Sequence, residues 1–181
     1  MSDLPSLSSL PQQPQETQLR VLDTLFEPSP ELHQLMSPVL AGQSFSSYAA
    51  LIDAVGGRMS ALSAVNSPTD RNVLFGILGS HPRLGRAPAN PEHLSELSKK
   101  EQAQLNEGAE EQAEKLRELN SEYEAKFPGM RTFVNGRSRD VIMAEMRQRI
   151  DRADSEREIT ETIQAMCDIA KDRAHKLQLN L

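Results

Sequence analysis

One histidine stands out among the side chains that could do acid–base chemistry. His81 follows Leu74, Ile77 and Leu78 at helical spacing, so the pattern places it toward the buried side of its segment. It also precedes Pro82, which ends a helix, and the dipole at a helix C-terminus favours a protonated imidazole. A protonated imidazole there suits a general acid. The simpler alternative is a capping histidine that donates to the last carbonyl groups of the helix.

A second segment combines hydroxyl, ammonium and carboxylate groups where a helix is predicted to begin. Ser98 and Glu101 have the spacing of an ordinary capping box, and Gln102 follows directly. The same arrangement exposes backbone N–H groups, which make a helix N-terminus a ready site for an anion such as a carboxylate. Both interpretations remain open from the sequence.

An arginine near the end of the chain has two comparable interpretations. Arg173 comes four residues after Ile169, close to the apolar face of the last predicted helix. An arginine at the edge of such a face usually extends to solvent. It could instead hold a carboxylate or a ureido group through two hydrogen bonds. Phe133 and Val134 form a brief extended segment and are most simply part of the core.

The sequence lacks the patterns of several common enzyme classes. It has no Gly-rich phosphate loop, no Gly-x-Ser-x-Gly and no His-Glu-x-x-His. Its four histidines show no ligand spacing, and its single cysteine, Cys167, excludes a multi-cysteine zinc site within one chain. We therefore expect no metal site.

The elements that must position these groups are helices. Helical periodicity runs through most of the chain after Thr17, and we find no pattern of paired strands. Serines that suit an N-cap precede most predicted helices, namely Ser29, Ser46 or Ser47, Ser67, Ser138 and, in a capping box with Glu158, Ser155. The fold is predicted to be an all-α bundle of roughly seven to eight helices. We expect one domain over residues 17–181, preceded by a flexible tail over residues 1–16 that is rich in Ser, Pro and Gln.

Charge and composition restrict the partners. The 181 residues include 20 Lys and Arg against 26 Asp and Glu, and the net charge of −6 disfavours a general binder of nucleic acid or anionic membranes. No apolar run approaches the length of about 20 residues that spans a bilayer. The first residues do not resemble a secretory signal, and the last three are Leu-Asn-Leu rather than the peroxisomal Ser-Lys-Leu. With one cysteine, which fits a reducing compartment, we expect a cytoplasmic protein.

Several segments together form an ordered pattern. They are His81-Pro82-Arg83-Leu84-Gly85, Ser98-x-x-Glu101-Gln102, Leu119-Asn120-x-x-Tyr123-x-x-Lys126-Phe127 and Arg173, preceded by Phe26-Glu27-x-Ser29-Pro30 and Gln43-x-Phe45. Their order and spacing resemble those of the 2-oxo-4-hydroxy-4-carboxy-5-ureidoimidazoline (OHCU) decarboxylases of urate breakdown. The resemblance covers most of the chain, from about Leu22 to Leu177.

This resemblance implies a function and a site. The family is all-helical, usually homodimeric, uses no metal or organic cofactor, and converts the ureidoimidazoline carboxylate to (S)-allantoin and CO₂; some members are peroxisomal. By the resemblance, His81 is the central catalytic residue, Glu101 orients it or binds the ring, and Arg173 holds an anionic or ureido end of the substrate. The implied substrate contacts are Pro82, Ser98, Gln102, Thr132, Phe133 and Val134.

A second hypothesis comes from a different functional class. A catalytically silent helical protein of the same fold would act as a binding or interaction module. Asn135, which stands where the family usually has an arginine, favours it, as do the capping interpretations of His81 and Ser98. Convergence of His81, Glu101 and Arg173 on one small pocket would argue for the decarboxylase.

Overall fold

A computed structural model describes residues 4–84, 96, 98–100, 110–134 and 136–179. Over these ranges the chain forms eight helical elements with defined bounds, further helical residues at 96 and 98–100, and no strand, which confirms the predicted all-α fold. In chain order the elements are η1 (Leu10–Gln12), α1 (Gln15–Phe26), α2 (Pro30–Gly42), α3 (Tyr48–Val65), α4 (Pro68–Leu78), α6 (Glu110–Lys126), α7 (Arg139–Arg152) and α8 (Ser155–Leu179).

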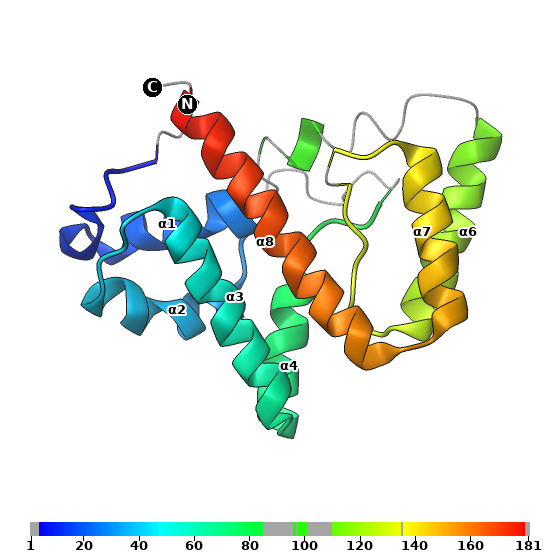
Figure 1. Cartoon of the computed structure of the whole chain (residues 1–181), viewed down its shortest axis with the longest axis horizontal. Helices are drawn as coiled ribbons and strands as arrows, with labels where there is room; N and C mark the ends of the chain where they lie inside the picture. The colour runs from blue at the N-terminus through cyan, green and yellow to red at the C-terminus, as the bar shows by residue number, and fades with distance from the viewer. Residues whose placement is uncertain (1–3, 85–95, 97, 101–109, 135, 180–181) are drawn as a thin grey trace.

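The longest helix, α8, runs through the middle of the molecule (Figure 1). It packs on α1 and α3 on one side, while α6 and α7 pair with each other at the opposite end of the molecule (Figure 1). Its buried side chains recur every three or four residues, at Ile159, Ile163, Met166, Ala170 and Ala174. One face of α8 is therefore continuous with the core. None of the helices described is both long and apolar enough to cross a membrane.

Helices α3 and α8 approach closely at a glycine. A β-carbon built on Gly56 would lie 2.9 Å from the Sγ atom of Cys167. Glycine costs a helix about 1 kcal/mol relative to alanine, and here it allows the two helices to touch. Cys167 is buried at this contact, and burial raises the pKa of its thiol to about 11. The thiol therefore stays protonated at neutral pH and belongs to the core.

Serine side chains begin four helices as predicted. Each accepts a hydrogen bond from a backbone N–H in the first turn of α2, α3, α4 or α7, and the four residues are Ser29, Ser47, Ser67 and Ser138. The capping box predicted at Ser155 is wrong, because Asp154 Oδ1 accepts from the backbone N–H of Arg157 at 3.0 Å. Glu158 is instead fully buried, where it accepts a hydrogen bond from Tyr123.

The segment expected to be a flexible tail packs on the helices where the structure describes it. Leu4 and Leu10 are both buried. The hydroxyl of Tyr48 donates to the carbonyl of Pro5 at 2.5 Å, and Gln18 Nε2 donates to the carbonyl of Leu10 at 3.0 Å. The Ser, Pro and Gln content of the segment gave no indication of these anchors.

Candidate active site

His81 lies beyond the end of α4 rather than within it. The helix ends at Leu78, and the N–H of Gly79 donates to carbonyl groups of its last turn. The prediction that the helix continues to His81 is therefore wrong, although Leu74 and Leu78 are buried as expected. Because Pro82 disfavours a helical conformation for the residue before it, the chain leaves the helix and His81 turns into the interior, where it is 5% exposed.

A small cavity adjoins the imidazole of His81. Its lining residues are His81, Pro82, Leu84, Ser98, Thr132, Phe133, Val134 and Ile169. The Phe133 ring packs edge-on against the imidazole, with ring centroids 4.7 Å apart and an interplanar angle of 76°. In the part of the chain that is described, His81 Nε2 and Thr132 Oγ1 are both buried and have no hydrogen-bond partner. Buried polar atoms of this kind indicate a place where a water or a ligand supplies the missing hydrogen bond.

The cavity is small for a substrate. Its volume is about 10 Å³, which is about the space that one water molecule needs. An organic substrate with a ring is several times larger, so the side chains around the cavity must move before such a molecule binds.

A buried polar cluster adjoins the cavity through Ser98. Arg173 on α8 is 1% exposed, and its Nη1 atom lies 3.2 Å from Glu27 Oε1. The same Nη1 donates to the carbonyl of Leu25, while Nη2 donates to Ser98 Oγ at 2.7 Å. The Ser98 hydroxyl in turn donates to Glu27 Oε1. The end of α1, the helical segment that contains Ser98, and α8, which are distant in sequence, therefore meet at one ion pair.

Glu27 is a site residue to which the sequence analysis gave no role, although it stands in the family-like pattern. It follows α1 with φ 79° and ψ 150°, a backbone region that is essentially reserved for glycine and costs about 1–3 kcal/mol. Its ion pair with Arg173 and the hydrogen bond from Ser98 hold it there. One signal was available, since a carboxylate is unfavourable at the C-terminal end of a helix dipole and Glu27 directly follows a predicted helix.

The electrostatics of the cluster keep the imidazole neutral. Burial, and then the nearby Arg173 guanidinium, lower the pKa of His81 to about 4, although Glu27 and a hydrogen bond to the Phe26 backbone oppose the shift. The protonated imidazole expected from the helix dipole is therefore not the form present at neutral pH. Because Nε2 has no partner in the described chain, we infer that Nδ1 makes the bond to Phe26 and that Nε2 presents a lone pair to the cavity.

Most of the expected site residues lie together. Six of them line the cavity, namely His81, Pro82, Ser98, Thr132, Phe133 and Val134. Arg173 does not extend to solvent but is buried beside Ser98. Ser98 is itself helical, and its hydroxyl bonds to Glu27. Glu101, Gln102 and Asn135 lie outside the described residues.

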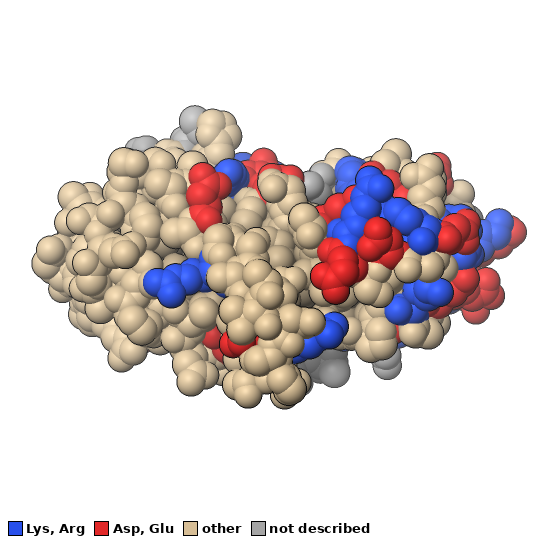
Figure 2. Space-filling model, turned by 60° about the horizontal axis from the view of Figure 1, so that its bottom comes forward, with Lys and Arg blue, Asp and Glu red and all other residues tan. Residues whose placement is uncertain are grey.

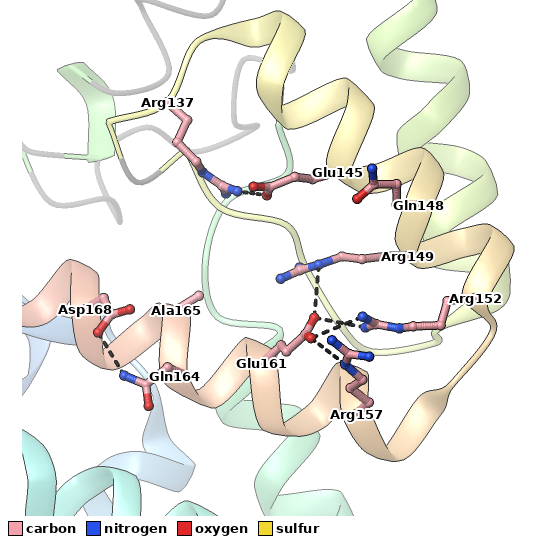
Figure 3. A pocket seen from close by; sticks show the side chains of 10 residues that line it. All are labelled: Arg137, Glu145, Gln148, Arg149, Arg152, Arg157, Glu161, Gln164, Ala165 and Asp168. Atoms are coloured by element: carbon pink, nitrogen blue, oxygen red, sulfur yellow. Dashed lines mark hydrogen bonds and ion pairs between the residues drawn. The ribbon is translucent and has the colours of Figure 1, made fainter.

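A larger cavity of about 490 Å³ lies between α7 and α8 (Figure 3). Glu161, one of the residues that line it, pairs with Arg152 and Arg157. Acidic and basic side chains are also intermingled across the surface at the end of the molecule that carries α6 and α7 (Figure 2). Because the charged groups that line this larger cavity largely satisfy one another, we assign the candidate active site to the smaller one.

Among the described residues, groups that bind metals do not gather at either cavity. Across the ranges that the structure describes, no three His, Cys, Asp or Glu side chains are placed to hold a metal ion. Among the described residues, the polar groups near His81 are the hydroxyls of Ser98 and Thr132 and the Arg173 guanidinium, which is paired with Glu27. Hydroxyl and guanidinium donors suit an organic anion with hydrogen-bonding groups.

Comparison with known proteins identifies a family. The family model described as OHCU decarboxylase matches residues 11–175, which is most of the chain. No curated protein and no solved structure matches. The matched range contains the whole lining of the small cavity together with Glu27 and Arg173. The chain therefore belongs to the OHCU decarboxylase family, the carboxy-lyases that convert OHCU to allantoin in urate catabolism.

Proposed function

We propose that this chain decarboxylates OHCU to (S)-allantoin at the cavity beside His81, with His81 and Arg173 as catalytic residues. The observation that carries the proposal is a buried imidazole nitrogen that lacks a partner in the described chain and adjoins a buried guanidinium through Ser98. A proton carrier and a fixed positive charge are the two groups that a decarboxylation without a cofactor needs.

The reaction determines where charge develops. The bond between the ring carbon and the carboxylate breaks, CO₂ leaves, and the electron pair moves into the neighbouring C=N bond. The hydroxyl on the same carbon becomes a carbonyl and gives up its proton, while the former C=N carbon and nitrogen each gain one. One proton is therefore consumed overall, because hydrogen replaces a carboxylate group.

His81 is suited to supply that proton when the substrate is bound. In the absence of substrate its low pKa keeps the ring neutral. An anionic substrate in the adjacent cavity favours the charged imidazole and raises this pKa. The imidazole then takes up a proton on substrate binding and delivers it from Nε2 to one face of the former C=N carbon of the substrate. Protonation from one face sets the handedness of the product.

Arg173 stabilises the negative charge as the electron pair moves into the ring. Its buried guanidinium lies where little water screens it, which strengthens this effect. Ser98, which bonds both Arg173 and Glu27, is the group that we expect to turn toward the substrate when the cavity opens. Thr132 Oγ1 supplies a further hydrogen bond, while Pro82, Phe133 and Val134 shape the wall.

The remaining parts of the proposal rest on the family resemblance. We expect Glu101 to orient His81 or bind the ring, and Gln102 to contact the substrate. We also expect a homodimer, which light scattering would detect as twice the chain mass of 20.1 kDa. The single cysteine supports a cytoplasmic location.

The proposal is tested with freshly made substrate. Urate oxidase and hydroxyisourate hydrolase generate OHCU from urate, and circular dichroism then follows the allantoin that forms after the purified protein is added. We expect a rapid, one-handed signal that heat-denatured protein does not produce. Racemic allantoin at the spontaneous rate would instead support a catalytically silent protein of the same fold.

A further inference from the structure

The wall segment Thr132–Val134 depends on a side chain that follows it in the sequence. The segment has no regular secondary structure, so no helix or sheet supplies partners for its carbonyl groups. Arg137 Nη2 donates to the carbonyl of Phe133 at 2.5 Å, and Arg137 Nε donates to the carbonyl of Val134 at 3.2 Å. One guanidinium thus holds two consecutive carbonyl groups of the cavity wall.

The local backbone brings Arg137 into this position. Gly136 has φ 68°, a left-handed conformation that glycine adopts without strain. The turn lets the backbone N–H of Arg137 donate to the carbonyl of Val134 at 3.0 Å, so the arginine side chain folds back over its own segment.

Helix α7 anchors the other side of the guanidinium. Arg137 Nη1 forms an ion pair with Glu145, which α7 presents at the rim of the larger cavity (Figure 3). Arg137 is three-quarters buried, and burial together with the nearby Arg149 lowers the pKa of its guanidinium. A negative partner is therefore needed to keep this charge in place, and Glu145 provides it.

We propose that Arg137 is a positioning residue for the decarboxylation, which holds Phe133 so that its ring fixes the orientation of the His81 imidazole. The contacts run from Glu145 on α7 through Arg137 to the carbonyl of Phe133, and from the Phe133 ring to His81. This inference deepens the proposed function and rests on it. Because the proton must reach one face of the substrate, a small rotation of the imidazole lowers the rate even when the fold is intact. Misplacement by about 1 Å can cost about a hundredfold in rate.

The fork of the arginine, rather than its charge, is the feature that this role needs. A lysine keeps the charge opposite Glu145 but is a point donor that does not reproduce the planar fork. Arg137→Lys is therefore the decisive variant, and Arg137→Ala removes both features. Arg147→Ala is the matched control, because Arg147 lies on α7, is 44% exposed and pairs with Glu122 and Asp151 away from the cavity.

The experiment combines stereospecific kinetics with NMR of the His81 ring protons. In both Arg137 variants we expect kcat to fall about tenfold or more with a smaller change in KM, and the His81 resonances to shift as the Phe133 ring moves. In Arg147→Ala we expect kcat within about twofold of wild type and unchanged His81 resonances. If Arg137→Ala does not fold, the kcat and the His81 resonances of Arg137→Lys test the proposal.

Two results would overturn the inference. One is a kcat of Arg137→Lys within about twofold of wild type. The other is a loss of kcat with His81 resonances that stay at their wild-type positions. A wild-type protein that makes allantoin no faster than the spontaneous reaction would refute the proposed function itself, so the two failures are distinguishable.

Discussion

Arg173 and Glu27 form an ion pair in which the Nη1 and Oε1 atoms lie 3.2 Å apart and both side chains are almost fully removed from solvent. A buried ion pair is weak evidence for stability, because desolvation of the two charges offsets much of their attraction. Here the pair joins the end of α1 to α8 and places two charges that act on His81. We therefore interpret it as part of the active site, where it maintains a buried cation beside His81.

Glu27→Gln removes the negative charge that faces Arg173 and should be strongly destabilising. Breaking a buried pair from one side costs about 3–5 kcal/mol, because one charge stays buried without its counterion. Urea unfolding measures the free energy of unfolding of wild type and variant. The control is Glu122→Gln, which removes an exposed carboxylate paired with Arg147 and should cost less than about 1 kcal/mol. Equal losses in the two variants would show that Glu27 and Arg173 are not coupled as described.

Stability should fall in mild acid because of His81. In the unfolded chain this imidazole takes up a proton below about pH 6.5, whereas in the folded protein it stays neutral down to about pH 4. The unfolded state thus binds more protons between these values, and acid favours unfolding. From pH 7 to pH 5 we expect His81 alone to cost about 2 kcal/mol.

His81→Asn provides the comparison for this pH effect, since asparagine does not titrate. The difference in unfolding free energy between wild type and variant should move by about 2 kcal/mol in favour of the variant as the pH falls from 7 to 5. A difference that stays constant over this range would mean that the folded imidazole has an ordinary pKa.

Tyr123→Phe should separate structural polar contacts from catalytic ones. The Tyr123 hydroxyl donates to Glu158 Oε1 at 2.6 Å, in a buried network that Arg149 also joins and that does not line the small cavity. Burial and the Glu158 carboxylate raise the pKa of this phenol, so it remains a donor. The variant should lose about 1–2 kcal/mol of stability and keep kcat within about twofold. Thermal unfolding measures the loss of stability, and the allantoin assay measures kcat. A large loss of kcat would show that Tyr123 takes part in catalysis.

Local patterns in the sequence predicted the helices well. The caps at Ser29 and Ser67 depend on residues within one turn, and the periodicity of α8 follows from its own sequence. The packing of Leu10 was missed because its partners lie outside its own short segment. One of them is Gln18 on α1, whose Nε2 donates to the Leu10 carbonyl. Contacts between distant segments leave little trace in a local pattern.

The candidate site was predictable only in part, for the same reason. His81 was recognisable beside Pro82, but its neutral state depends on burial and on Arg173, which lies far along the chain. The choice for Arg173 between solvent and interior depended on Glu27, whose role is invisible without the fold. Amphipathic spacing alone could not decide between these outcomes.

The catalytic role of His81 is tested most simply by comparing wild type and His81→Asn in the coupled urate assay followed by circular dichroism. Asparagine is polar and uncharged, so we expect the variant to keep the helical far-ultraviolet spectrum and the thermal unfolding transition of wild type at neutral pH. If His81 is the proton donor, one-handed allantoin forms rapidly with wild type, and the variant yields racemic product at the spontaneous rate. A folded variant that retains the wild-type rate and handedness would contradict the assignment of His81 as the proton donor.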